Sequence, residues 1–170
     1  MASYGRTSAA VQMNCPLSDS RSTRGNQRAR VRMTDEEVWA CLREFTGEIV
    51  MSTLHRDGSI HSVAMYYGVL GNRIGVLTKR RSQKVRNLLR DPRMTCLMAT
   101  GSSYGELRGV ELVGTADVTD DVDTMRELAI NIRRRRGQPF DEETLQATVY
   151  NRVAVIHTVT RIVSWDHRKL

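Results

Sequence analysis

A run of basic and hydroxyl side chains lies at the boundary between an apolar segment and an amphipathic one. The run is Thr78-Lys79-Arg80-Arg81-Ser82-Gln83-Lys84-Val85-Arg86-Asn87. The pattern predicts a strand that ends near Thr78 and a helix over 81–90, so the cations crowd a helix N-terminus. Cations are disfavoured at this end because it carries partial positive charge. A bound phosphate would resolve the conflict, with Thr78 and Ser82 as additional hydroxyl donors. A solvated basic loop is the alternative interpretation.

Other residues give weaker signals. Met65, Tyr66 and Tyr67 lie within an expected strand, where such side chains form either core packing or the wall of a binding site. The arginine run 133–136 ends an expected helix, where cations complement the helix dipole, and contact with an acidic partner is the alternative. The four histidines show no metal-ligand spacing, so no metal site is predicted. The common hydrolase and nucleotide-hydrolase motifs are absent from the sequence.

The elements that position these residues follow from periodicity and turn signals. Thr34 and Glu37 form a capping-box pattern, and Asp57-Gly58 between two apolar runs predicts a hairpin. We expect helices over 34–46, 81–90, 121–135 and 141–151, and strands over 48–54, 60–70, 73–78, 94–99, 106–118 and 152–159. This order predicts a mainly β (α+β) fold, a small antiparallel barrel with peripheral helices.

Length and composition restrict the class of protein. A chain of 170 residues suits one domain, and it contains no apolar run long enough to cross a membrane. The three cysteines, Cys15, Cys41 and Cys96, include no C-x-x-C pair, which favours a reducing, cytoplasmic compartment.

The net charge of +7 is concentrated near the N-terminus. Residues 1–32 contain six arginines and one aspartate, so this segment carries +5 and the remainder only +2. A nucleic-acid-binding face on the folded part is therefore disfavoured. The segment is polar, and we expect residues 1–32 to be a disordered basic extension and residues 33–170 to be the folded domain. Translation from Met33 and a targeting role for the extension are alternative interpretations.

Three further strings stand out in the sequence: Ser82-Gln83-Lys84-Val85-Arg86-Asn87-Leu88-Leu89-Arg90-Asp91-Pro92-Arg93, then Tyr104-Gly105-Glu106-Leu107-Arg108-Gly109-Val110, and finally Ser164-Trp165-Asp166-His167-Arg168-Lys169-Leu170. Together they resemble the pyridoxamine 5′-phosphate oxidase-like family, and within it the actinobacterial branch that includes deazaflavin (coenzyme F420)-dependent reductases. The similarity extends over about residues 33–170.

The resemblance implies a split β-barrel homodimer with two cofactor sites at the subunit interface. It implies that Lys79, Ser82 and Lys84, followed by Thr78, hold the cofactor phosphate. It also implies that the segment 62–67 runs beside the tricyclic ring and that Trp165 reaches the partner's site. The expected ring contacts are Ser62, Met65, Tyr66 and Tyr67.

The function implied by the resemblance is hydride transfer from reduced F420 to a small organic acceptor. The cofactor would supply the hydride, and Tyr66, Tyr67 or water would supply a proton. One departure matters, because many relatives have Pro-Met-Trp-Tyr where this chain has Val63-Ala64-Met65-Tyr66-Tyr67. This difference leaves the ring type and the substrate open. An FMN-dependent oxidase or reductase and a non-catalytic flavin- or haem-binding carrier are the alternatives.

Overall fold

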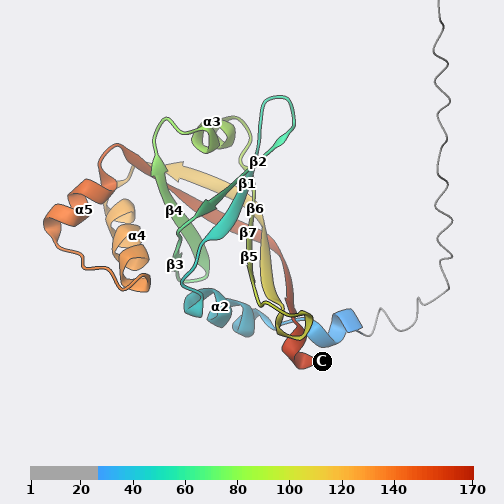
Figure 1. The fold of residues 1–170 in the computed structure, drawn as a ribbon. Helices are drawn as coiled ribbons and strands as arrows, with labels where there is room; N and C mark the ends of the chain where they lie inside the picture. Colours follow the sequence, from blue (N-terminus) through green and yellow to red (C-terminus); the bar gives the residue numbers. More distant parts are fainter. Residues whose placement is uncertain (1–26) are drawn as a thin grey trace, which may run out of the picture.

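The computed structural model describes residues 27–170, which form a curled antiparallel sheet with helices packed around it (Figure 1). The strands are β1 (Ile49–Leu54), β2 (Ile60–Met65), β3 (Gly68–Leu70), β4 (Arg73–Lys79), β5 (Arg93–Thr100), β6 (Arg108–Thr119) and β7 (Arg152–Asp166). The helices are α2 (Asp35–Glu44), α3 (Gln83–Arg90), α4 (Val122–Arg135) and α5 (Glu142–Val149), with 3-10 turns η1 (Tyr104–Glu106) and η2 (His167–Lys169). The predicted mainly β class with peripheral helices is confirmed.

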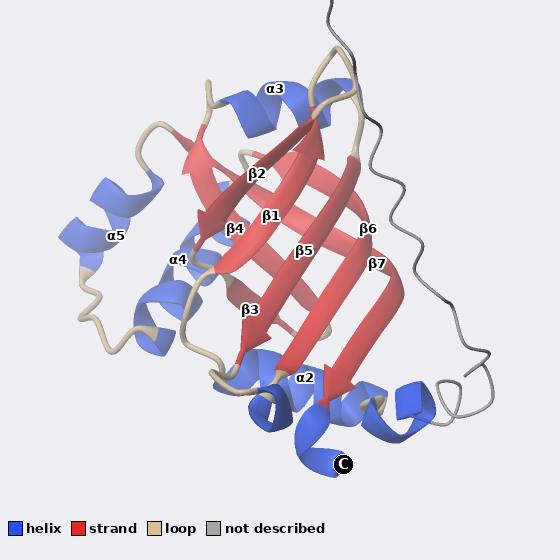
Figure 2. Ribbon diagram, turned by 45° about the vertical axis from the view of Figure 1, so that its right-hand side comes forward, coloured by secondary structure: helices blue, strands red, loops and turns tan. Residues whose placement is uncertain are grey.

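The sheet has an open side. Hydrogen bonds join the strands in the order β2-β1-β5-β6-β7-β4-β3, so β2 and β3 are its two edges (Figure 2). Only Tyr66 and Tyr67 separate these edge strands in the chain. Since β3 pairs only with residues 73–75 of β4, residues 76–79 have no strand partner on that side in the described part of the chain. The result is a half-barrel whose opening lies between β2 and the second half of β4.

The main core fills the inside of the half-barrel. Alternate residues of the strands point inward, as the period of two requires, and α2 closes one end with its buried face. The predicted capping box is present, because the Thr34 hydroxyl accepts from the Glu37 amide and the Glu37 carboxylate accepts from the Thr34 amide. The largest fully buried side chains include Leu42, Ile49, Met51, Ile74, Met98 and Leu112.

A second, smaller core lies outside the half-barrel, where α4 and α5 cover β3, β4 and β7. Close approach of α4 requires glycine at Gly75, because a Cβ there would lie 3.0 Å from a Leu128 methyl and 2.9 Å from an Ile156 methyl. Asn131 of α4 then pairs with the backbone of Val69 in β3. Its amide oxygen accepts from the Val69 amide at 2.9 Å, and its amide nitrogen donates to the Val69 carbonyl at 3.1 Å. This side chain therefore takes the place of a further strand at the β3 edge.

The structure corrects several predicted boundaries. The expected strand 60–70 is interrupted after Met65, because Tyr67 turns into the core. The last strand continues to Asp166 instead of ending near 159, since a bulge opposite Val113 and Gly114 restores its pairing with β6. The expected disordered extension lies mostly outside the described residues. Its last part, residues 27–31, is helical, and Val31 is buried. The described helices include none that is long and apolar enough to span a membrane.

Candidate functional site

Three of the four predicted phosphate contacts meet at the start of α3. Thr78 is buried, and its hydroxyl oxygen lies 3.3 Å from the Ser82 hydroxyl oxygen. The Lys84 ammonium donates to the Thr78 hydroxyl at 3.2 Å. Partial burial lowers the pKa of Lys84. The sequence therefore places two hydroxyls and one partly desolvated cation together, at the end of β4 and the first turn of α3.

The first turn of α3 differs from those of the other helices. Ser82 occupies the N-cap position, yet among the described residues its side chain caps no backbone amide, and the first turn holds no acidic residue. By contrast, α2, α4 and α5 each have a side-chain cap and at least one acidic residue in the first turn. Free amides, hydroxyls and an ammonium group together suit a phosphate or carboxylate.

Lys79, the fourth predicted contact, points to the other face of β4. Successive side chains of a strand alternate, so Lys79 and Leu77 lie on the side of β4 that points away from the half-barrel, while Thr78 points inward. Lys79 pairs across the sheet with Arg152, the first residue of β7. The predicted basic cluster is thus divided between two faces of one strand end.

The four residues predicted to contact the cofactor ring also lie in different places. Ser62 is exposed on β2, with its hydroxyl oxygen 2.9 Å from that of Ser52. Met65 and Tyr66 line a cavity described below. Tyr67 lies in the main core, where its hydroxyl donates to the backbone carbonyl of Leu42 at 2.7 Å and burial raises its pKa to about 12. The structure therefore places Tyr66, but not Tyr67, where it can face a ligand.

His61 lies on β2, at the edge of the sheet. Burial lowers the pKa of His61 most, followed by the charges of His55 and Lys84. Lys84 belongs to α3, and α3 packs against β1, the strand beside β2.

A cavity of about 420 Å³ lies at the opening, between the end of β2, β4 and the C-terminal end of α4. Met65 and Leu77 supply apolar walls, and Arg133, Arg136 and Arg152 also line it. The Arg136 guanidinium carbon lies 3.7 Å from the centre of the Tyr66 ring. Sequence reasoning assigned the arginine run to the helix dipole, and no local pattern indicated that Arg152 would join it from β7.

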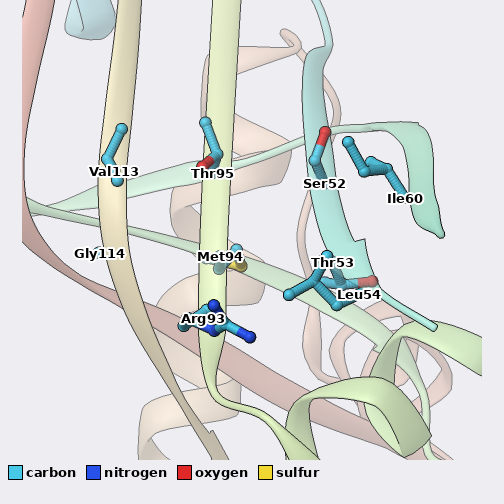
Figure 3. A pocket seen from close by; sticks show the side chains of 9 residues that line it. All are labelled: Ser52, Thr53, Leu54, Ile60, Arg93, Met94, Thr95, Val113 and Gly114. Atoms are coloured by element: carbon cyan, nitrogen blue, oxygen red, sulfur yellow. The ribbon is translucent and has the colours of Figure 1, made fainter. Parts of the chain in front are cut away.

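A second hollow, of about 240 Å³, lies on the outer face of the sheet (Figure 3). Its lining comes from β1, β2, β5 and β6: Ser52, Thr53, Leu54, Ile60, Arg93, Met94, Thr95, Val113 and Gly114. The same face exposes large apolar side chains, namely Val50, Ile60, Leu97 and Val163. We call this surface the outer face; it offers apolar contact but few groups for chemistry.

Trp165 lies far from the hydroxyl cluster of its own chain. It packs over Gly109, where a Cβ would come within 2.1 Å of the indole ring. Arg152 and Trp165 stand near opposite ends of β7, roughly 43 Å apart along the strand at about 3.3 Å per residue. Within one copy, Trp165 therefore lies near the opposite end of β7 from Arg152, the residue that pairs with Lys79 beside the start of α3.

Comparison with known proteins places this geometry in a family. A conserved hypothetical protein from Mycobacterium tuberculosis, Rv2991, is 32% identical over 84% of this chain and 91% of its own, with a TM-score of 0.80. A structure described as an F420 reductase (20% identity, 72% and 94% coverage, TM-score 0.59) and the haem storage protein HutZ from Vibrio cholerae (12%, 78% and 96%, TM-score 0.61) share the fold. No curated protein is similar enough to count as a match. The family model for pyridoxamine 5′-phosphate oxidase matches residues 34–162, so this chain belongs to the pyridoxamine 5′-phosphate oxidase-like split-barrel family.

Proposed function

We propose that this chain is an oxidoreductase that binds the deazaflavin coenzyme F420 and reduces a small organic acceptor. The observation that carries the proposal is the uncapped first turn of α3, with Thr78, Ser82 and Lys84 converging on it. These groups fit the phosphate of such a coenzyme. A structural neighbour described as an F420 reductase supports the choice, although at 20% identity it shows the fold alone.

The chain's own residues have limited tasks in this chemistry. When bound, the reduced coenzyme supplies the hydride. Thr78, Ser82 and Lys84 hold the phosphate, and the end of β2 with Met65 and Tyr66 orients the ring and excludes water from one side. Positioning of donor and acceptor lowers the barrier by several kcal/mol. Tyr66 is the tyrosine in position to deliver a proton, because the Tyr67 hydroxyl is bonded to backbone carbonyls in the core.

Replacing Lys84 with alanine is expected to weaken coenzyme binding by about 10- to 150-fold, because a hydrogen bond to a charged group is worth about 1.5–3 kcal/mol. The measurement is a fluorescence titration of the full-length protein with F420 and, separately, with FMN. Arg86→Ala is the matched control, since Arg86 lies on the same helix and is exposed. Equal coenzyme affinity in Lys84→Ala and the wild type would contradict the proposed phosphate site.

The same titration distinguishes an F420-dependent reductase from an FMN-dependent enzyme. Tighter binding of FMN than of F420 would favour FMN-dependent chemistry. A carrier function is favoured by the description of two structural neighbours, one from Mycobacterium smegmatis and HutZ, as haem-binding or haem-storage proteins. Haem binding without turnover of any reduced flavin or deazaflavin would support that second candidate.

We further propose that two copies associate through the outer face. Its exposed apolar side chains on adjacent strands are what a dimer interface requires, and the partner's Trp165 would then reach the site that it cannot reach in its own chain.

Leu97→Glu is expected to convert the dimer into monomers, because it introduces a charge opposite Val50 in the middle of this face. Light scattering after size-exclusion chromatography measures the mass. Leu89→Glu is the control, since Leu89 is 72% exposed and belongs to α3, outside the strands that form the outer face. A monomeric wild-type protein, or a dimer in the folded Leu97→Glu variant, would contradict the proposed interface.

A further inference from the structure

We infer that the cavity between β2, β4 and α4 binds the carboxylate of a planar acceptor, and that Arg136 and Arg152 select it. This inference rests on the proposed function in one respect, namely that the carboxylate ligand is the acceptor that is reduced. The cavity, of about 420 Å³, is large enough for a bicyclic aromatic molecule. Its walls combine the apolar side chains of Met65 and Leu77 with arginines.

The charge of this lining is unbalanced. Three arginines, Arg133, Arg136 and Arg152, face a single acidic residue, Glu48. Within residues 27–170, none of these arginines forms an ion pair with a carboxylate. Elsewhere on the surface arginines do find such partners, as in the pair of Arg126 with Glu142. A cavity that gathers cations without counter-ions is suited to an anionic ligand.

Two of these arginines, Arg133 and Arg136, are held in place by contacts that leave donors available. Arg133 donates to the Pro139 carbonyl at 2.8 Å and to the Thr148 hydroxyl at 3.3 Å. Arg136 stacks on Tyr66 and donates one N–H to the Gln138 side chain at 3.2 Å. A stacked guanidinium keeps its remaining N–H groups in a plane, which matches the two oxygens of a carboxylate. The Tyr66 ring extends the same surface for an aromatic body.

The helix dipole does not account for the whole arrangement. It explains cations at the C-terminal end of α4, such as Arg133 in the last turn and Arg136 at the C-cap. It does not explain Arg152, which belongs to β7 and lines the cavity from the other side. The cavity is also distinct from the proposed phosphate position, since Leu77 and Thr78 point to opposite faces of β4.

Two matched probes test the inference: naphthalene-2-carboxylate and its neutral isostere naphthalene-2-carboxamide. Isothermal titration calorimetry on the full-length protein, with and without F420, gives the affinity for each. We expect the wild type to bind the carboxylate about tenfold more tightly than the carboxamide, as a charge-assisted pair requires. Arg136→Gln and Arg152→Gln should each remove most of this preference, because each lowers the carboxylate affinity more than the carboxamide affinity. Arg134→Gln is the control, because Arg134 lies 5.5 Å from the Phe140 ring and does not line the cavity.

The outcomes separate this inference from the proposed function. Equal affinities for the two probes, binding of neither, or equal losses in Arg134→Gln would overturn the carboxylate site even if F420 binds tightly. Loss of F420 affinity in Arg136→Gln and Arg152→Gln with an unchanged probe preference would assign the arginines to the coenzyme and also overturn it. A carboxylate preference that depends on both arginines, in a protein that binds no F420, would support the site and contradict the proposed coenzyme.

Discussion

Replacement of Arg135 by alanine is expected to lower the free energy of unfolding by about 3 kcal/mol. The Arg135 guanidinium donates to the backbone carbonyls of Leu42 and Arg43 at 2.8 Å each, and to that of Phe45. These carbonyls end α2 and have no further helical partners. The same guanidinium lies 4.5 Å from the centre of the buried Tyr67 ring. Its removal leaves several polar groups without charge-assisted bonds, and urea denaturation measures the loss.

Two further substitutions make this result specific. Arg134→Ala is expected to change stability by less than about 0.5 kcal/mol, because Arg134 is exposed and its guanidinium lies over the exposed Phe140 ring. Arg135→Lys should recover only part of the loss, since an ammonium group lacks the planar fork that reaches several carbonyls. An Arg135→Ala protein as stable as Arg134→Ala would show that the contact with the end of α2 contributes little.

Acidification is expected to destabilise the protein between about pH 6.5 and about pH 4 through His157. This side chain is fully buried in the half-barrel, and within residues 27–170 neither ring nitrogen forms a hydrogen bond of normal geometry. Burial lowers its pKa to about 4, and the backbone of Met94 opposes the shift only in part. Because the unfolded chain takes up this proton at higher pH than the folded one, stability is complete above pH 6.5 and falls as pH decreases towards 4. The loss reaches about 3 kcal/mol.

His157→Leu should remove this part of the pH dependence. Leucine has a similar volume and no polar atom to desolvate, so the variant is expected to be more stable than the wild type, most clearly near pH 4.5. Urea denaturation at pH 8.0 and pH 4.5 gives the change in the free energy of unfolding between these pH values for each protein. His55→Gln serves as the control, because His55 is only partly buried. Parallel pH profiles for the wild type and His157→Leu would assign the acid sensitivity to other groups, such as His61.

Much of the fold was accessible from the sequence because local signals agreed with one another. The capping box at Thr34, the Asp57-Gly58 hairpin and the periodicity of α3 and α4 all appear where expected. The end of β7 was not accessible, because its pairing with β6 depends on a bulge between residues far apart in sequence. The interruption after Met65 was hidden for a related reason: Tyr67 leaves the strand to bond carbonyls of α2, a contact that no local pattern encodes.

The candidate site could be predicted in part from the sequence, for the same physical reasons. Charges that conflict with a helix dipole can be seen in a short window, and the structure does bring Thr78, Ser82 and Lys84 together. Strand alternation, which depends on the exact register, then directs Lys79 to the opposite face. The arginine-lined cavity needs α4 and β7 to meet in space, so Arg152 gave no signal in the sequence.

The amide of Asn131 also has a consequence for self-association by strand addition. An edge strand exposes unpaired N–H and C=O groups, which another chain can extend into a larger sheet. At β3 the Asn131 side chain occupies both outward groups of Val69, so this edge is blocked by the chain itself. Among the described residues, no side chain pairs in this way with the outward backbone groups of β2. This edge borders the opening where the coenzyme is proposed to lie. A bound coenzyme would therefore shield the remaining template for aggregation, and the empty protein is the form most exposed to it.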